Sequence, residues 1–151
     1  MAEKQFVIFK LGEQNYCVDI MDIGGITEYK ESTKIPESPY FVEGVINLRG
    51  SVIPIINLKK RFGIAEERKA EDCRVVLYNM NGTQIGFLVD EANQVIKLNS
   101  EDIDPTPEII KGEDKHYIDG MGKMGEQIVI VINFAKILTD VELNQVTQMN
   151  M

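Results

Sequence analysis

The feature that most constrains the fold of this chain is an internal repeat. Two pairs of segments match without gaps at an offset of 76 residues, and a third pair matches more weakly at an offset of 71. The pairs are 41–44 with 117–120, 52–58 with 128–134, and 16–19 with 87–90. One such unit is too small to bury a good core alone, so the repeat predicts two related units packed together. The alternative is coincidental similarity between apolar strands.

Short runs rich in β-branched and aromatic residues fill much of the chain. The run 5–11 has apolar residues on both sides of the pleat, which predicts a strand buried on both faces. The close spacing of such runs favours small barrels over βαβ units. We expect strands at 5–11, 16–20, 44–48, 51–57, 73–80, 83–89, 93–98 and 127–133.

One region has helical periodicity. Four apolar residues near the C-terminus follow Asn133 at helical spacing, which predicts an N-capped helix over 133–146 docked by one apolar stripe. These residues are Phe134, Ile137, Leu138 and Val141.

The length of 151 residues fits one domain or two small subdomains. We expect approximate halves at 5–70 and 71–138, with strands free to cross between them. The charged segment 63–72 is expected to connect the halves, and residues 100–108, with two prolines, are expected to form a surface loop.

Charge and hydropathy exclude several classes of partner. The formal net charge of −8 repels phosphate backbones and anionic lipids, which argues against nucleic-acid binding. No apolar run approaches the roughly 20 residues of a membrane helix, so we expect a cytoplasmic protein without direct membrane insertion. Cys17 and Cys73 lie among β-type apolar residues and are expected to be buried and reduced.

The sequence lacks convincing catalytic or metal-binding motifs. His116 is the only histidine, and no GxSxG, HExxH, CxxC or Walker pattern occurs. The GxGxxG pattern at 120–125 is followed by an apolar strand rather than a helix, so it predicts a hairpin loop and not a dinucleotide site. We therefore expect no catalytic residue, no metal and no cofactor.

Four segments of the chain resemble the CheW family of chemotaxis adaptors. They are 40–58 (YFVEGVINLRGSVIPIINL), 6–20, 86–90 and 117–122. The resemblance extends from about Gln5 to about Leu138. It implies a single CheW-like domain over 1–151, an all-β fold of two SH3-like five-stranded β-barrels packed together with a C-terminal helix. Because the length leaves no room for an ATP-binding or phosphoacceptor domain, it implies a stand-alone adaptor and not an enzyme.

The resemblance also implies two partners. The cytoplasmic tip of a chemoreceptor would lie in a hydrophobic groove between the barrels, and the regulatory domain of the histidine kinase CheA would bind another face. The implied receptor-binding residues are Val7, Ile20, Ile23, Ile26 and Val95. The alternative for each of these is a purely structural role in the core.

Arg49 matches the functional arginine of the family, and the resemblance assigns Glu43 and Gly44 with it to binding of the kinase or the receptor. The alternative for Arg49 is a solvated turn residue. Many relatives have a glutamate where this chain has the second glycine of Gly24-Gly25, so the resemblance does not extend to a polar receptor contact there. The glycine pair also favours a bulged strand.

The function implied is coupling of chemoreceptors to CheA at membrane-associated receptor arrays. An alternative is a scaffold of the same fold that serves a non-chemotactic histidine kinase pathway.

Overall fold

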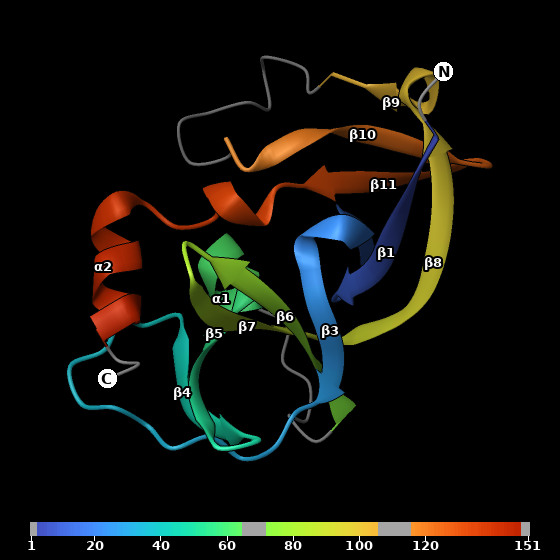
Figure 1. The fold of residues 1–151 in the computed structure, drawn as a ribbon. Coiled ribbons are helices and arrows are strands. Elements are labelled where there is room, and N and C mark those ends of the chain that lie inside the picture. Colours follow the sequence, from blue (N-terminus) through green and yellow to red (C-terminus); the bar gives the residue numbers. More distant parts are fainter. Residues whose placement is uncertain (1–2, 65–71, 106–115, 149–151) are drawn as a thin grey trace.

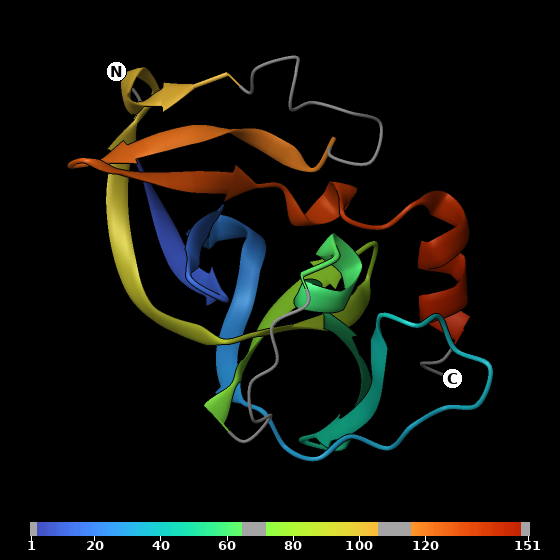
Figure 2. The same cartoon turned by 180° about the vertical axis from the view of Figure 1, so that it is seen from behind.

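The computed structural model describes residues 3–64, 72–105 and 116–148, which form two β-sheets with short helices (Figures 1 and 2). The strands are β1 (Glu3–Leu11), β2 (Gln14–Asp19), β3 (Ile23–Glu28), β4 (Val42–Leu48), β5 (Ser51–Asn57), β6 (Arg74–Met80), β7 (Thr83–Val89), β8 (Glu91–Asn99), β9 (Ile103–Asp104), β10 (Ile118–Met124) and β11 (Gln127–Ile132). The six-stranded sheet has the order β8-β1-β2-β11-β10-β9, and the five-stranded sheet has the order β3-β6-β7-β5-β4. The predicted all-β fold of two units is confirmed, with six and five strands rather than five each.

The helices are short. They are α1 (Leu58–Phe62), α2 (Asp140–Gln148) and the 3₁₀ turns η1 (Ile20–Asp22), η3 (Ser100–Asp102) and η5 (Phe134–Lys136). Both views place α2 beside the start of β4, at the side of the five-stranded sheet (Figures 1 and 2). An ion pair of 3.3 Å between Arg61 of α1 and Glu142 of α2 helps to hold α2 there.

The internal repeat is visible as repeated structure. Antiparallel hairpins β4–β5 and β10–β11 each have a bulge after their first residue pair. Asn57 and Asn133 each end such a hairpin, and each side chain caps the following turn by accepting a backbone hydrogen bond. The backbone N–H groups of both residues donate to Phe41 and Tyr117 at 2.7 and 2.8 Å. A coincidental match between apolar strands does not explain this agreement in backbone geometry.

The two halves of the repeat exchange hairpins. Hairpin β1–β2 pairs with β8, and β2 pairs in parallel with β11. In the same way, β6–β7 pairs with β3, and β7 pairs in parallel with β5. Each sheet therefore combines one hairpin with strands from the other half, so the halves 5–70 and 71–138 do not coincide with the sheets. Most of the predicted connector, residues 65–71, lies outside the described residues.

Buried apolar residues form three clusters, and β1 contributes to two of them. Phe6 and Ile8 lie in a small cluster within the six-stranded sheet, whereas Val7 and Phe9 lie in the largest cluster. This confirms the prediction that 5–11 is buried on both faces. A third cluster belongs to the five-stranded sheet. Cys17 and Cys73 are both buried and form no disulfide, as predicted, and burial raises the pKa of Cys17 to about 12.

The predicted helix over 133–146 is wrong as a single element. Asn133 caps only η5, and a new helix, α2, begins at Asp140. The backbone N–H of Thr139 donates to the Glu142 carboxylate, and the N–H of Glu142 donates to the Thr139 hydroxyl. This capping box begins a separate helix, so α2 does not continue from η5. Val141, predicted to dock, is therefore exposed.

The glycine-rich segment 120–125 is not a loop, because most of it is strand β10. Cβ atoms added at Gly120 and Gly122 would lie 2.7 Å from the Asp104 carbonyl oxygen and 2.9 Å from Val129. These glycines thus permit close strand packing, and only Gly125, with φ of +64°, lies in the turn. Residues 100–104 of the predicted surface loop form η3 and β9, and 106–108 lie outside the described residues.

Candidate functional site

Four of the five predicted receptor-binding residues lie on or beside strands that end a sheet. Ile23 and Ile26 lie on β3, at one end of the five-stranded sheet, and Val95 lies on β8, at one end of the six-stranded sheet. Ile26 and Val95 are 39% and 51% exposed. Ile20, in η1, and Ile23 are partly buried against the largest core cluster.

Val7 differs from the other four. It lies opposite Val95 in the β1–β8 register, but its side chain is only 2% exposed within the largest cluster. Val7 therefore supports the strand pair, and Val95 is the member of this pair that reaches the surface. Met21, between Ile20 and Asp22 in η1, is 85% exposed and was missed by sequence reasoning. We call Ile20, Met21, Ile23, Ile26 and Val95 the apolar edge residues.

Arg49 is held in an unusual backbone conformation. It occupies the two-residue turn between β4 and β5, with φ of +53°, and Gly50 follows with φ of +88°. The Gly50 N–H donates to the Asn47 side chain at 3.0 Å. The left-handed region costs a residue such as arginine about 1–2 kcal/mol. The turn after β6 uses the more suitable Asn81, with φ of +54°, so the strain at Arg49 motivates a functional hypothesis.

Glu43 and Gly44 lie at the other end of β4, and the structure does not bring them to Arg49. The Glu43 carboxylate accepts a hydrogen bond from Asn57 at 2.7 Å and pairs with Lys60 at 3.2 Å. Partial burial raises the pKa of Glu43, but the hydrogen bonds from Asn57 and Lys60, together with the charges of Lys60 and Lys34, lower it overall. A Cβ at Gly44 would collide with the Thr33 carbonyl oxygen. Both residues therefore shape the start of β4.

A buried ion pair joins the two halves, and no sequence motif predicted it. The Lys59 ammonium lies 2.8 Å from the Asp90 carboxylate, with side chains 10% and 2% exposed. The other Asp90 carboxylate oxygen accepts the Gly12 N–H at 2.7 Å. Asp90 lies where the chain passes from β7 in one sheet to β8 in the other. This carboxylate thus connects α1, the β1–β2 turn and the crossover.

A pocket of about 330 Å³ lies between β3 and the β4–β5 turn. It brings together three features that the sequence singled out separately, namely Ile26, Arg49 and the Gly24-Gly25 pair. Leu48, Leu77 and Gln84 also line it. We call it the Gly24 pocket. β3 is bulged between Ile23 and Gly25, as the glycine pair predicted.

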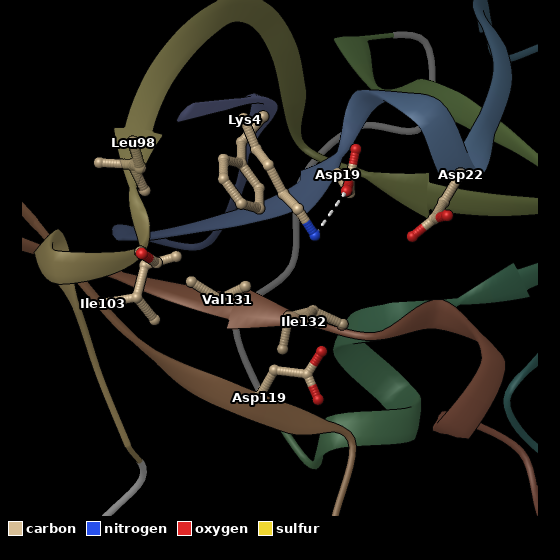
Figure 3. Close-up of a pocket in the computed structure, with 10 residues that line it drawn as sticks. Lys4, Asp19, Asp22, Leu98, Ile103, Asp119, Val131 and Ile132 are labelled. Atoms are coloured by element: carbon tan, nitrogen blue, oxygen red, sulfur yellow. Dashed lines mark ion pairs between the residues drawn. The ribbon is translucent and has the colours of Figure 1, made fainter. Parts of the chain in front are cut away.

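A second pocket, of about 270 Å³, has three aspartates around an apolar lining (Figure 3). Lys4 forms a 3.8 Å ion pair with Asp19 at its edge. Burial, followed by the nearby charge of Asp19, raises the pKa of Asp22, and the charge of Asp119 adds to this. Among the described residues, no group of three or more carboxylate, histidine or cysteine side chains is arranged to hold a metal ion.

The comparison with family models decides the classification. The model of the CheW-like domain matches residues 5–142. The chain belongs to the CheW-like domain family.

Similar CheW proteins come from distant bacteria. The chain is 34% identical to the chemotaxis protein CheW of Klebsiella aerogenes, over 93% of this chain and 84% of that protein. It is 34% identical to the CheW of Treponema pallidum, over 96% and 88%. The crystal structure of the scaffolding protein TtCheW from Thermoanaerobacter tengcongensis superposes with a TM-score of 0.84 at 35% identity, covering 93% of this chain and 96% of that one.

Membership of the CheW-like family assigns the chain to the non-catalytic adaptors and scaffolds of chemotaxis. Its surface, rather than a reaction centre, is thus where function is to be sought. The TtCheW structure shares the fold over nearly the whole chain. None of the helices in the described part of the chain has the length and apolar character needed to cross a bilayer.

Proposed function

We propose that this chain is a cytoplasmic adaptor that couples chemoreceptors to the histidine kinase CheA at receptor arrays. The observation that best supports the proposal is the presence of exposed apolar side chains on η1, β3 and β8 and of one strained arginine on a CheW-like fold. The apolar edge residues provide a docking surface, and Arg49 provides a directional polar contact.

The receptor partner is the helical tip of the chemoreceptor cytoplasmic region. A helix that buries its apolar face against a protein surface needs exposed apolar side chains on that surface. Met21, Ile26 and Val95 meet this requirement, since they are among the exposed large apolar residues. Ile20 and Ile23 support them from below, because both pack against the core.

The kinase partner is the regulatory domain of CheA, which binds outside the apolar edge residues. Arg49 is suited to pair with a carboxylate of either partner, kinase or receptor, because a guanidinium offers two parallel N–H donors. Glu43 and Gly44 contribute to binding of either partner indirectly, because they hold the start of β4, the strand that leads to Arg49.

Coupling requires no bond to be made or broken by the adaptor. A receptor state that changes its contacts with the adaptor alters how the adaptor holds the kinase. Allosteric coupling of this kind typically corresponds to about 1–3 kcal/mol. The adaptor transmits it only if its contacts differ between receptor states.

Pairwise binding measurements with purified proteins test this proposal. The probes are a receptor cytoplasmic fragment and the CheA regulatory domain, and the chain is expected to bind each. Ile26→Asp should greatly weaken receptor binding, because it places a charge on the apolar surface. Val141→Asp is the matched control, since Val141 is an exposed apolar residue on α2, away from this surface. Absence of binding to both probes would contradict the proposal.

A scaffold for a non-chemotactic histidine kinase is the second candidate. It predicts binding to a kinase module without binding to any chemoreceptor fragment. The same two measurements therefore separate the candidates.

A further inference from the structure

The turn between β6 and β7 contains the one Asn-Gly pair in the sequence, Asn81-Gly82. Both residues are exposed, and no described residue lies within 4 Å of a Cβ added at Gly82. Asparagine is a thermolabile residue, and a following glycine exposes its side-chain amide to attack, because glycine has no Cβ to shield its own backbone nitrogen. Asn81 is therefore the asparagine of this chain whose sequence context most favours deamidation.

Deamidation at this pair needs water but no enzyme or cofactor. The Gly82 backbone nitrogen attacks the side-chain carbonyl carbon of Asn81, and the new N–C bond closes a succinimide ring. The Gly82 N–H proton leaves with the Asn81 amide nitrogen as ammonia. Water then adds to either ring carbonyl, which gives aspartate or, where the main chain now runs through the former side chain, isoaspartate. Either product has a carboxylate in place of the amide.

The backbone geometry of the folded turn opposes this reaction. Asn81 and Gly82 form a two-residue hairpin connection with φ of +54° and +85°, the φ values of a type I′ turn. The ψ angle at the first position of such a turn is about +30°. The Gly82 nitrogen then points away from the Asn81 Cβ, whereas ring closure requires both on the same side of the Cα–C bond. The turn must therefore open before the succinimide can form.

The side chain of Asn79 helps to keep the turn closed. Its oxygen accepts the Gly82 N–H at 2.9 Å, so it engages the nitrogen that would attack. The β4–β5 turn has the same arrangement, with the Gly50 N–H donating to the Asn47 side chain at 3.0 Å. Because Arg49 precedes that glycine, the β4–β5 turn has the same hydrogen bond but no amide that could react with Gly50.

We propose that Asn81 is a site of spontaneous deamidation that the closed β6–β7 turn protects, with the hydrogen bond from Gly82 to Asn79 as part of this protection. The reaction proceeds from molecules in which the turn has opened. Isoaspartate lengthens the main chain, so the two-residue turn that joins Met80 to Thr83 cannot re-form. Because β6 and β7 lie between β3 and β5, conversion weakens the five-stranded sheet from within.

Conversion of Asn81 is measured on the full chain by peptide mass spectrometry after incubation at alkaline pH. Asn79→Ala removes the acceptor of the Gly82 N–H, and Asn47→Ala is the matched control, since it removes the equivalent acceptor in the β4–β5 turn. We expect Asn79→Ala to speed conversion about two- to tenfold, the range that corresponds to one hydrogen bond. Asn47→Ala and Asn79→Asp, which retains an acceptor oxygen, should convert Asn81 at the unmodified rate. Unfolding the unmodified chain in urea should raise the rate more than Asn79→Ala does.

Folded and urea-unfolded chains that convert at the same rate would overturn the inference, because the turn would then give no protection. Unchanged conversion in Asn79→Ala, or equal acceleration by Asn47→Ala, would also overturn it, since the hydrogen bond to Asn79 would have no specific role. The purified isoaspartate form should unfold at a lower urea concentration than Asn81→Asp, which has the same charge without the longer main chain. Equal midpoints would contradict the proposed damage to the turn.

Discussion

The chain passes between the two sheets twice, and the two crossovers differ in how they are held. Asp90, between β7 and β8, is buried and pairs with Lys59 at 2.8 Å. Asp19, its counterpart in the repeat, ends β2 before η1 and pairs with Lys4 at 3.8 Å at the surface. The same residue type thus fixes one crossover inside the protein and caps a solvent-exposed turn at the other.

The repeat explains the difference. Lys59 follows β5, and β5 pairs with β7, the strand that leads into the buried crossover. At the matching position after β11, the chain has Ala135, so no lysine reaches Asp19 from that side. The buried crossover can therefore hold the sheets together, while the open one exposes Met21 beside the proposed receptor surface. The two matching crossovers of the repeat therefore have different roles.

The largest expected effect comes from breaking the buried crossover. Asp90→Ala removes the partner of Lys59 and the acceptor of the Gly12 N–H, so unfolding free energy should fall by about 3–5 kcal/mol. Asp19→Ala removes a turn cap and a surface pair and should cost only about 1 kcal/mol. Urea denaturation of both variants measures the difference. Equal losses would show that the crossovers are not specialised.

The matched glycines of the hairpins should be next in effect. Gly44→Ala and Gly120→Ala would each press a Cβ into a neighbouring backbone oxygen, of Thr33 and Asp104 respectively. We expect each to lose about 1–3 kcal/mol of unfolding free energy, as overpacked sites do. Gly44 should be the more sensitive, because its φ of +144° also disfavours alanine. Gly24→Ala, expected to be nearly neutral, is the control in the same denaturation series.

The strained turn at Arg49 should lower the stability of the fold while it favours receptor binding. Arg49→Gly relieves the left-handed conformation and should raise unfolding free energy by up to about 1 kcal/mol, while receptor binding weakens. Asn81→Ala should lower stability instead, because asparagine tolerates the left-handed conformation of its turn better than alanine does. Thermal unfolding and receptor titration of both variants provide the test. If Arg49→Gly is destabilising, strain at Arg49 is not the reason for a functional assignment.

The smallest effect sharpens the comparison of the crossovers. Ala135→Lys supplies the exposed crossover with a cation at the position that Lys59 occupies in the other half. Because Ala135 is exposed, we expect a gain of no more than about 0.5 kcal/mol, which high salt should remove. Denaturation at low and high salt measures it. A gain as large as the loss in Asp90→Ala would mean that burial is not what distinguishes the pairs.

Local patterns and the repeat predicted most strands, because alternation and turn residues such as Asn81-Gly82 are local signals. β3 was not among the strands expected from residue type, because Gly24-Gly25 disfavours a strand, and pairing with β6 overrides that preference. Only the resemblance indicated a strand there, with a bulge at the glycine pair. β10 was missed because its glycines serve close packing, which only the neighbouring strand reveals. The exchange of hairpins between halves also depends on long-range pairing.

The candidate site was predicted in part. The family resemblance supplied Ile26, Val95 and Arg49, and the structure places all three at the surface. It could not show that Val7 is buried, because that depends on the packing of β1 into the largest core cluster. Nor could it show that Arg49 and Gly24 share a pocket, because that depends on where β3 folds relative to the β4–β5 turn. The Lys59–Asp90 pair could not be predicted from the sequence, because its members are 31 residues apart and no motif joins them.

The central claim is that one chain binds receptor and kinase at the same time through different surfaces. Sedimentation of the full chain mixed with the receptor cytoplasmic fragment and the CheA regulatory domain tests it most directly. The account predicts a ternary complex that contains all three proteins and that Ile26→Asp reduces to the adaptor–kinase pair. Displacement of one partner by the other would contradict it, because the two would then share a single surface.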